Sequence, residues 1–217
     1  MPEALTPIDP LPKLTDVQKE QLVAYDELLR EHNQTVNLVS RATADESWER
    51  HVRHCLALTA RRFPAGANVV DYGAGGGLPG LVLAIAFPDT RFYLVDAVLK
   101  KVRAVDDMAR RLGLDNVEAH HARAEKWKGP EGGAAYAVSR ATAPLSTLWR
   151  WFEPVRVRAE LEKGCWAPGL LALKGGDLRA EIADLTDRRP RLQIQSTPLG
   201  ELLPGWSDPT KVLLSVR

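Results

Sequence analysis

A cluster of glycines directly after a short apolar run constrains this chain more than any other feature. The run Asn68–Asp71 ends on an acid, and four glycines follow between Gly73 and Gly77. Glycine permits positive φ and lets a ligand approach the backbone closely, although it costs conformational entropy on folding. A helical pattern beginning at Pro79 then offers free N–H groups in its first turn. The sequence therefore predicts a strand, a ligand-binding turn and a helix in succession.

From the turn at Pro64–Gly66 onward, short apolar runs alternate with helical stretches. This alternation is typical of βαβ units and predicts a doubly wound α/β domain with a mostly parallel sheet. The predicted strands are Asn68–Asp71, Arg91–Val95, Val117–His120, Ala135–Ser139, Leu170–Leu173, Leu192–Gln195 and Val212–Val216. The predicted helices are Pro79–Phe87, Lys100–Leu112, Ser146–Val155 and Asp177–Asp187.

The first 62 residues follow a different pattern. Residues 1–13 contain four prolines, which predicts an irregular arm. Apolar residues at helical spacing predict an amphipathic helix over 15–32, and a second helix, rich in charge and histidine, runs from Asp45 to about Arg62. We interpret residues 1–62 as an N-terminal arm and helical extension and residues 63–217 as the ligand-binding domain, with both parts in one compact unit.

Composition narrows the class of protein. The chain has 29 Lys and Arg against 28 Asp and Glu, so any affinity for nucleic acid has to come from local clusters of cations. Cys55 and Cys165 match no zinc spacing and are expected to be buried thiols, and we predict no metal site. The pair His120-His121 lacks a partner at metal-ligand spacing. No segment resembles a membrane helix or a signal peptide, so we expect a cytoplasmic protein. We also expect the protein to be a monomer.

The glycine spacing fits two ligands. Gly75, Gly77 and Gly80 match the dinucleotide pattern G-x-G-x-x-G. Gly73, Gly75 and Gly77 instead form a G-x-G-x-G turn with Asp71 two residues before it. An acid there would repel a pyrophosphate, whereas it could hold the amino group of S-adenosylmethionine (SAM) directly or through water. The position of Asp71 therefore favours SAM, with an NAD-dependent oxidoreductase as the alternative.

A second acid, Asp96, ends the next predicted strand. Because SAM and NAD both carry a ribose diol, Asp96 suits either ligand. Arg140 ends the fourth predicted strand beside the turn, where a substrate would approach. We expect Arg140 to contact a phosphate or a base edge, with an ion pair to a nearby carboxylate as the other interpretation.

Several blocks in order make the chain resemble the GidB/RsmG family, bacterial methyltransferases that modify guanine N7 in small-subunit ribosomal RNA. The most specific is Asp71–Gly80, because its Leu-Pro-Gly ending is uncommon in other methyltransferases. The remaining blocks are Asn37–Ser40, Arg53-His54, Asp96 with Lys100–Arg103, Arg123–Glu125, Ser139–Ala141 and Ala172–Gly175.

The resemblance implies a Rossmann-like SAM-dependent methyltransferase fold with a seven-stranded sheet and an N-terminal helical extension. It implies SAM as cofactor and 16S rRNA or the small ribosomal subunit as partner. Arg140 would close the site as its catalytic residue. Together with the turn analysis, it predicts that SAM contacts Asp71, Gly73, Gly75, Gly77, Leu78, Asp96, Ala124, Glu125 and Arg140.

The chain departs from the family pattern at several positions, including Ala74 in the turn and His32, and three of the departures motivate another substrate. Ala57 and Leu58 stand where the family usually shows Asp-Ser, and Thr142 replaces a phenylalanine that could stack on a base. A SAM-dependent methyltransferase acting on another RNA or on a small molecule is therefore an alternative, as is a non-catalytic SAM or RNA binder. The histidines and arginines of 51–54 could face RNA or could pack the helix on the domain.

Overall fold

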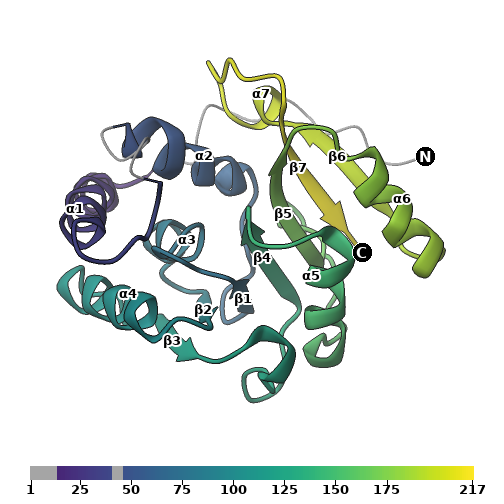
Figure 1. The fold of residues 1–217 in the computed structure, drawn as a ribbon, viewed down its shortest axis with the longest axis horizontal. Helices are drawn as coiled ribbons and strands as arrows, with labels where there is room; N and C mark the ends of the chain where they lie inside the picture. Colours follow the sequence, from purple (N-terminus) through teal and green to yellow (C-terminus); the bar gives the residue numbers. More distant parts are fainter. Residues whose placement is uncertain (1–13, 41–45) are drawn as a thin grey trace.

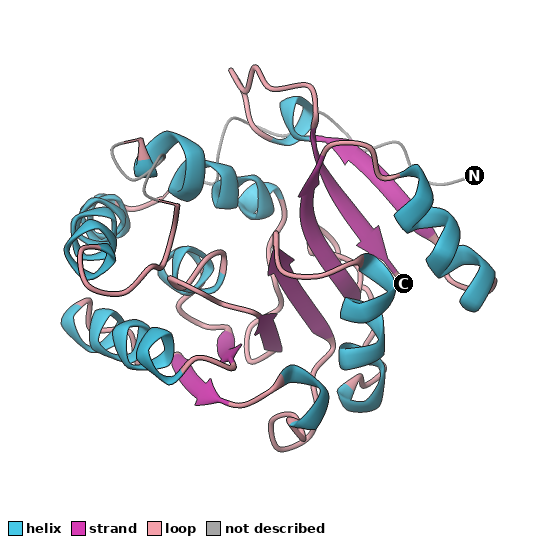
Figure 2. Ribbon diagram, in the orientation of Figure 1, coloured by secondary structure: helices cyan, strands magenta, loops and turns pink. Residues whose placement is uncertain are grey.

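The computed structural model of the chain describes residues 14–40 and 46–217. Within them a seven-stranded sheet lies between two layers of helices (Figures 1 and 2). All seven predicted strands are present, which confirms the α/β class. The strands are β1 (Asn68–Tyr72), β2 (Arg91–Asp96), β3 (Val117–His121), β4 (Tyr136–Arg140), β5 (Gly169–Gly175), β6 (Ile194–Pro198) and β7 (Lys211–Val216).

The strand order is β3-β2-β1-β4-β5-β7-β6. Strand β7 is antiparallel to both of its neighbours, β5 and β6, whereas the other paired strands are parallel. A dinucleotide-binding sheet has the order 3-2-1-4-5-6. The order of the last two strands, β7 and β6, therefore differs from the order in the fold that an NAD-dependent oxidoreductase would use. From β1 the successive strands β2 and β3 are added on one side of the sheet, whereas β4 and β5 are added on the other side. In open α/β sheets, ligands bind in the crevice at the point where the strand order reverses in this way.

Each central strand buries both of its faces. Val69 packs in the core with the helices of one layer, whereas Val70 and Tyr72 pack in the core of the other layer. Successive side chains of a strand point to opposite faces, so a strand covered on both sides requires apolar residues at nearly every position. The short continuous apolar runs in the sequence reflect this burial.

One layer consists of α1 (Asp16–Asn33), α3 (Gly80–Ala86) and α4 (Leu99–Arg111) (Figure 1). Helix α1 begins at a capping box in which Thr15 and Gln18 exchange hydrogen bonds. Its buried side chains, including Tyr25, belong to the same core cluster as the sheet. The predicted helix over 15–32 is thus confirmed. A division of the chain at residue 62 stays a prediction.

The second N-terminal helix is irregular. It consists of a π-helical turn (Trp48–Val52), α2 (Arg53–Leu56) and a 3-10 turn (Ala57–Ala60). The predicted start at Asp45 and the predicted arm over 1–13 lie outside the described residues. Ala57 and Leu58, which depart from the family pattern, are fully buried in the core. Their replacement therefore affects packing rather than a surface that meets a ligand.

The opposite layer consists of α5 (Leu145–Phe152) and α6 (Arg179–Arg188) (Figure 1). Trp149 on α5 is buried. Cys55 and Cys165 are also buried. A short helix that the sequence pattern did not predict, α7 (Leu199–Leu202), precedes β7. None of the helices in the described ranges is long and apolar enough to cross a membrane.

Candidate active site

The glycine turn follows β1 and is tied to the neighbouring strand β2. The N–H groups of Gly73 and Ala74 both donate to the carbonyl oxygen of Val95, at 2.8 and 3.2 Å. The N–H of Gly75 donates to the Asp96 carboxylate at 3.0 Å. Gly73 adopts φ +72°, a conformation that other residues adopt only at a cost. Asp96 is thereby held at the edge of the turn, and its contact with a ligand stays a prediction.

Asp71 lies beneath the turn and not on its surface. Its carboxylate is fully buried and accepts a hydrogen bond from the Gly80 N–H at 2.8 Å, which fastens the start of α3 to β1. Its other oxygen has no hydrogen-bond partner among the described residues. Burial raises the pKa of Asp71 to about 7, against the lowering influence of the Gly80 N–H and of Arg140. Contact between Asp71 and SAM stays a prediction, whereas the structural role was not anticipated.

The Asp71→Asn variant is expected to gain stability over the wild type as pH rises from 5 to 8. The folded-state pKa of Asp71 is raised from 3.8 to about 7, so the native state binds the proton more tightly than the unfolded state. Wild-type stability therefore falls with rising pH through that window, by roughly 2 kcal/mol over the interval. The asparagine oxygen can still accept the Gly80 N–H. Urea unfolding at both pH values measures the difference.

The comparison isolates Asp71 because both proteins share every other titrating group. His51 and His54, whose pKa values are lowered, contribute equally to both unfolding curves. A stability difference that stays constant between pH 5 and 8 would contradict the assignment of a buried, proton-binding Asp71.

A pocket of about 400 Å³ opens over the glycine turn. It brings together five of the nine predicted SAM contacts: Gly73, Gly75, Leu78, Asp96 and Arg140. Asp71, Gly77, Ala124 and Glu125 do not line it. Ala124 and Glu125 form a short turn after β3, at the same edge of the sheet. Their contact with SAM, like that of Asp71 and Gly77, stays a prediction.

Sequence reasoning missed part of the pocket wall. Leu38 and Val39 line it, and their N–H groups both donate to Asn33 Oδ1 at 2.9 Å, which shapes the segment after α1. Lys101, from the basic start of α4, also lines the pocket. The block Asn37–Ser40 had been part of the family resemblance, but its residues carried no predicted role.

Thr142 covers the turn from the other side. Its hydroxyl donates to the carbonyl oxygens of Gly73, at 3.3 Å, and Arg140, at 3.1 Å. Ala141 adopts φ +52°, which folds the chain back over the turn. A Cβ atom on Gly73 would overlap the Thr142 side chain. The segment Arg140–Thr142 therefore forms a wall against the glycine turn, and the glycine at position 73 is required for the close approach.

Arg140 is held by a histidine. Arg140 Nη1 lies 3.0 Å from His51 Nδ1, and an arginine can only donate, so Nδ1 accepts and the ring proton is on Nε2. Burial, followed by the charge of Arg140, lowers the pKa of His51 to about 4, so the ring is neutral near pH 7. No ion pair of Arg140 is found within residues 14–40 and 46–217. The ion-pair interpretation of Arg140 thus finds no partner in these ranges and stays a hypothesis.

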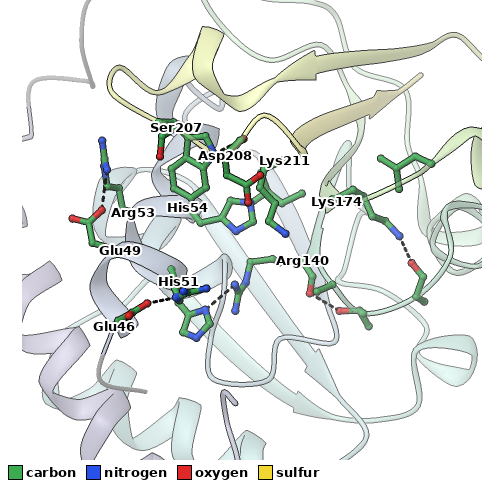
Figure 3. Close-up of a pocket in the computed structure, with 18 of the residues that line it drawn as sticks. Glu46, Glu49, His51, Arg53, His54, Arg140, Lys174, Ser207, Asp208 and Lys211 are labelled. Atoms are coloured by element: carbon green, nitrogen blue, oxygen red, sulfur yellow. Dashed lines mark hydrogen bonds and ion pairs between the residues drawn. The ribbon is translucent and has the colours of Figure 1, made fainter. Parts of the chain in front are cut away.

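A second and larger pocket, of about 850 Å³, lies beyond Arg140 (Figure 3). It shares His51, Arg140, Ala141 and Thr142 with the first pocket. Its wall comes from segments far apart in the sequence: the π-helical turn and α2, the loop after β4, the end of β5, and the loop before β7. The charged residues lining it are Glu46, Glu49, Arg50, Arg53, Arg140, Lys174, Glu181, Asp208 and Lys211.

Most of these charges are paired. Lys174 forms an ion pair with Glu181 at 2.5 Å and donates to the Ala143 carbonyl oxygen, and Arg53 pairs with Glu49 at 2.8 Å. Arg50 pairs with Glu46. For Arg140 and Lys211 the described part of the chain provides no ion pair. Asp208 also lines the pocket without an ion pair in that part of the chain, so two cations and one acid remain unpaired at the pocket wall.

The comparison with protein families decides between the possible ligands of the turn. Residues 18–199 match the model of the family described as GidB, rRNA small subunit methyltransferase G. The chain belongs to the GidB family. It is therefore a methyltransferase that depends on SAM, and the NAD alternative left by the glycine spacing is set aside.

Individual relatives agree with this family. Ribosomal RNA small subunit methyltransferase G of Salinibacter ruber is 50% identical over 195 residues, covering 89% of this chain and 89% of the relative. The protein of the same name from Chlorobium luteolum is 40% identical over 212 residues, covering 94% and 84%. The match therefore extends over most of both chains.

Solved structures share the fold. A SAM dependent methyltransferase from Aquifex aeolicus superposes with a TM-score of 0.53 at 15% identity, covering 79% of this chain and 91% of that one. A ribosomal protein L11 methylase from Lactobacillus delbrueckii subsp. bulgaricus gives a TM-score of 0.55 at 11% identity, covering 76% of each chain. At these identities the likeness concerns the fold of the GidB-family chain and not its substrate.

Proposed function

We propose that this GidB-family chain transfers a methyl group from SAM to N7 of a guanine in 16S rRNA of the small ribosomal subunit. The observation that carries the proposal is the meeting of two pockets at the wall Arg140–Thr142. One pocket lies on the glycine turn and the other is larger and presents unpaired cations. The name of the family, rRNA small subunit methyltransferase G, supports the choice of RNA as substrate.

The residues of the first pocket suit SAM. Its volume of about 400 Å³ lies within the usual range for small-molecule sites. Asp96 accepts one backbone N–H on each oxygen, from Gly75 and Val98, and each oxygen keeps a second lone pair for a ribose hydroxyl. The turn at Gly73 and Gly75 exposes backbone to the ligand. Bound SAM supplies an activated methyl group on a sulfonium.

The chain needs little acid–base chemistry for this acceptor. Guanine N7 already carries a lone pair, so no proton has to be removed before it is methylated. The task of the residues is to align the base, which accelerates reactions by holding the groups in place. The Arg140 guanidinium, oriented by neutral His51, can donate to a guanine O6 or to a phosphate while N7 stays free. A hydroxyl acceptor would more often need a general base.

Incubation of small ribosomal subunits with methyl-labelled SAM tests the proposal. The subunits and their naked rRNA come from a strain that lacks the corresponding gene, and nucleoside mass spectrometry reports the product. The expected product is N7-methylguanosine at one position. Label on another nucleotide, or only on small molecules, would favour the alternative substrates and reject guanine N7.

The proposal includes a monomer acting in the cytoplasm, where ribosomal RNA is available. Light scattering of the purified chain, with and without SAM, measures the oligomeric state. A stable dimer would require revision of the partner assignment but not of the reaction.

A further inference from the structure

The far end of the second pocket carries an aromatic ring, Trp206, that contacts a histidine and an arginine. Trp206 lies in the loop between α7 and β7 and stacks on His54, with ring centroids 5.3 Å apart and an interplanar angle of 27°. The guanidinium carbon of Arg53 lies 6.0 Å from the centroid of the indole ring. Arg53 also donates to the Pro204 carbonyl oxygen at 3.1 Å. Trp206 is therefore fixed in orientation although it is only partly buried.

Two buried nitrogen atoms of residues that line this pocket lack partners among the described residues. His54 Nε2 and Arg140 Nε are buried and have no hydrogen-bond partner in the described ranges, and both residues line the pocket. His54 is 7% exposed, and burial lowers its pKa to about 3, so the ring is neutral. Buried polar atoms in native proteins are nearly always paired with protein or water. Unpaired nitrogens in a pocket wall therefore point to a polar ligand.

Arg140, His54 and the loop before β7 follow one another along the wall of the second pocket. Figure 3 shows His54 between Arg140 and the loop that carries Ser207 and Asp208, with Lys211 beside it. Arg140 also lines the pocket over the glycine turn, whereas Trp206 and Lys211 line only the second pocket. The second pocket has about twice the volume of the first, 850 against 400 Å³. It offers more room than a single target base would use.

We infer that Trp206, His54 and Lys211 form a subsite for a nucleotide adjoining the target guanine. Its base stacks on the Trp206 ring, and its phosphate meets the Lys211 ammonium. Stacking on an aromatic ring is tolerant of sequence because every base has a π face. Lys211 has no ion pair within the described residues and contributes a charge that attracts the backbone. This inference rests on the proposed function, because it requires an RNA substrate.

A competing role for Trp206 is to pin the loop before β7 onto α2. The two roles predict different substitution patterns. Phenylalanine keeps a π face for both the base and His54, whereas leucine keeps apolar bulk without one. We expect Trp206→Phe to retain kcat/KM for small ribosomal subunits within about threefold. Trp206→Leu should lower kcat/KM by about tenfold or more, the range found when a base loses its aromatic partner.

The effect should appear in KM for RNA, while the Kd for SAM and the thermal midpoint stay near wild type. Trp151→Leu serves as the control, because Trp151 lies on α5 against Tyr72 and lines neither pocket. It should leave kcat/KM near wild type. If Trp206→Leu matches Trp206→Phe in kcat/KM, or if its loss follows a fall in the thermal midpoint, the subsite is wrong and the loop-pinning role stands.

Lys211→Gln gives a second measure that does not depend on the indole. Removal of one phosphate contact should reduce the slope of log K against log salt concentration for RNA binding by about one. An unchanged slope overturns the assignment of Lys211. If the wild type methylates neither ribosomal subunits nor rRNA, the proposed function fails first and the subsite fails with it. If the wild type is active and both variants match it, only the subsite fails.

Discussion

Replacement of Gly73 with alanine is expected to lower the affinity for SAM by at least about a hundredfold. The residue adopts φ +72°, and an alanine there costs about 1–2 kcal/mol of backbone strain. The added methyl group would also overlap the Thr142 side chain, so the wall Arg140–Thr142 has to move away from the turn. Both effects act at the first pocket. Isothermal titration of the variant with SAM measures the loss.

Gly66→Ala is the matched control for this prediction. Gly66 adopts φ +73°, almost the same as Gly73, but a Cβ there would meet no atom within 4 Å. Gly66 precedes β1 at the other end of the strand and lines neither pocket. We expect Gly66→Ala to lose folding stability through backbone strain alone, with no change in SAM affinity. Equal SAM affinity in both variants would mean that the cofactor does not bind on the glycine turn.

The second large effect is expected at Arg140. Arg140→Ala should lower kcat/KM for small ribosomal subunits by about 10²–10³, the loss seen when one well-placed donor is removed from an active site. Arg140 lines both pockets, and His51 holds its guanidinium at 3.0 Å. Arg140→Lys should recover only part of the activity, because an ammonium lacks the planar fork of donors. Steady-state kinetics with saturating SAM measures both variants.

An arginine outside the pockets separates this effect from a general loss of positive charge. Arg188 lies on α6, pairs with Asp184 at 2.7 Å and lines neither pocket. Arg188→Ala removes the same charge and should leave kcat/KM close to wild type. An Arg140→Ala variant that methylates subunits at the wild-type rate would remove Arg140 from the mechanism.

The strands could be predicted because burial on both faces of the sheet requires short continuous runs of apolar residues. Each apolar run, such as Arg91–Val95, coincides with a strand to within two residues at its ends, except that β6 continues three residues past the predicted end at Gln195. Helix α7 was missed because four residues are too few to show a helical period. The antiparallel direction of β7 could not be predicted either, because an apolar run does not indicate whether the strand runs parallel or antiparallel to its neighbours.

The first pocket could be predicted in part for a similar reason. Gly73 directly follows β1, and Asp96 is the last residue of the adjacent strand β2. The carboxyl ends of parallel strands lie at the same edge of the sheet, so the two residues could be expected to lie close together. Asp71 was placed on the ligand side although it shares a strand face with Val69, which packs in the core beneath α3. The period of two within β1 could have indicated its burial. A motif alone does not distinguish a buried acid from one that meets a ligand.

The sequence by itself determined the α/β class, the glycine turn and the acid at the end of β2, because these depend on local spacing. It also carried the blocks that identify the GidB family. Only the tertiary structure decided that Asp71 supports the turn, that His51 holds Arg140, and that the loop with Trp206 closes the second pocket. Those contacts join segments separated by as many as 152 positions, as for His54 and Trp206. Such contacts arise from packing a whole core, and the local pattern of neither segment specifies its partner.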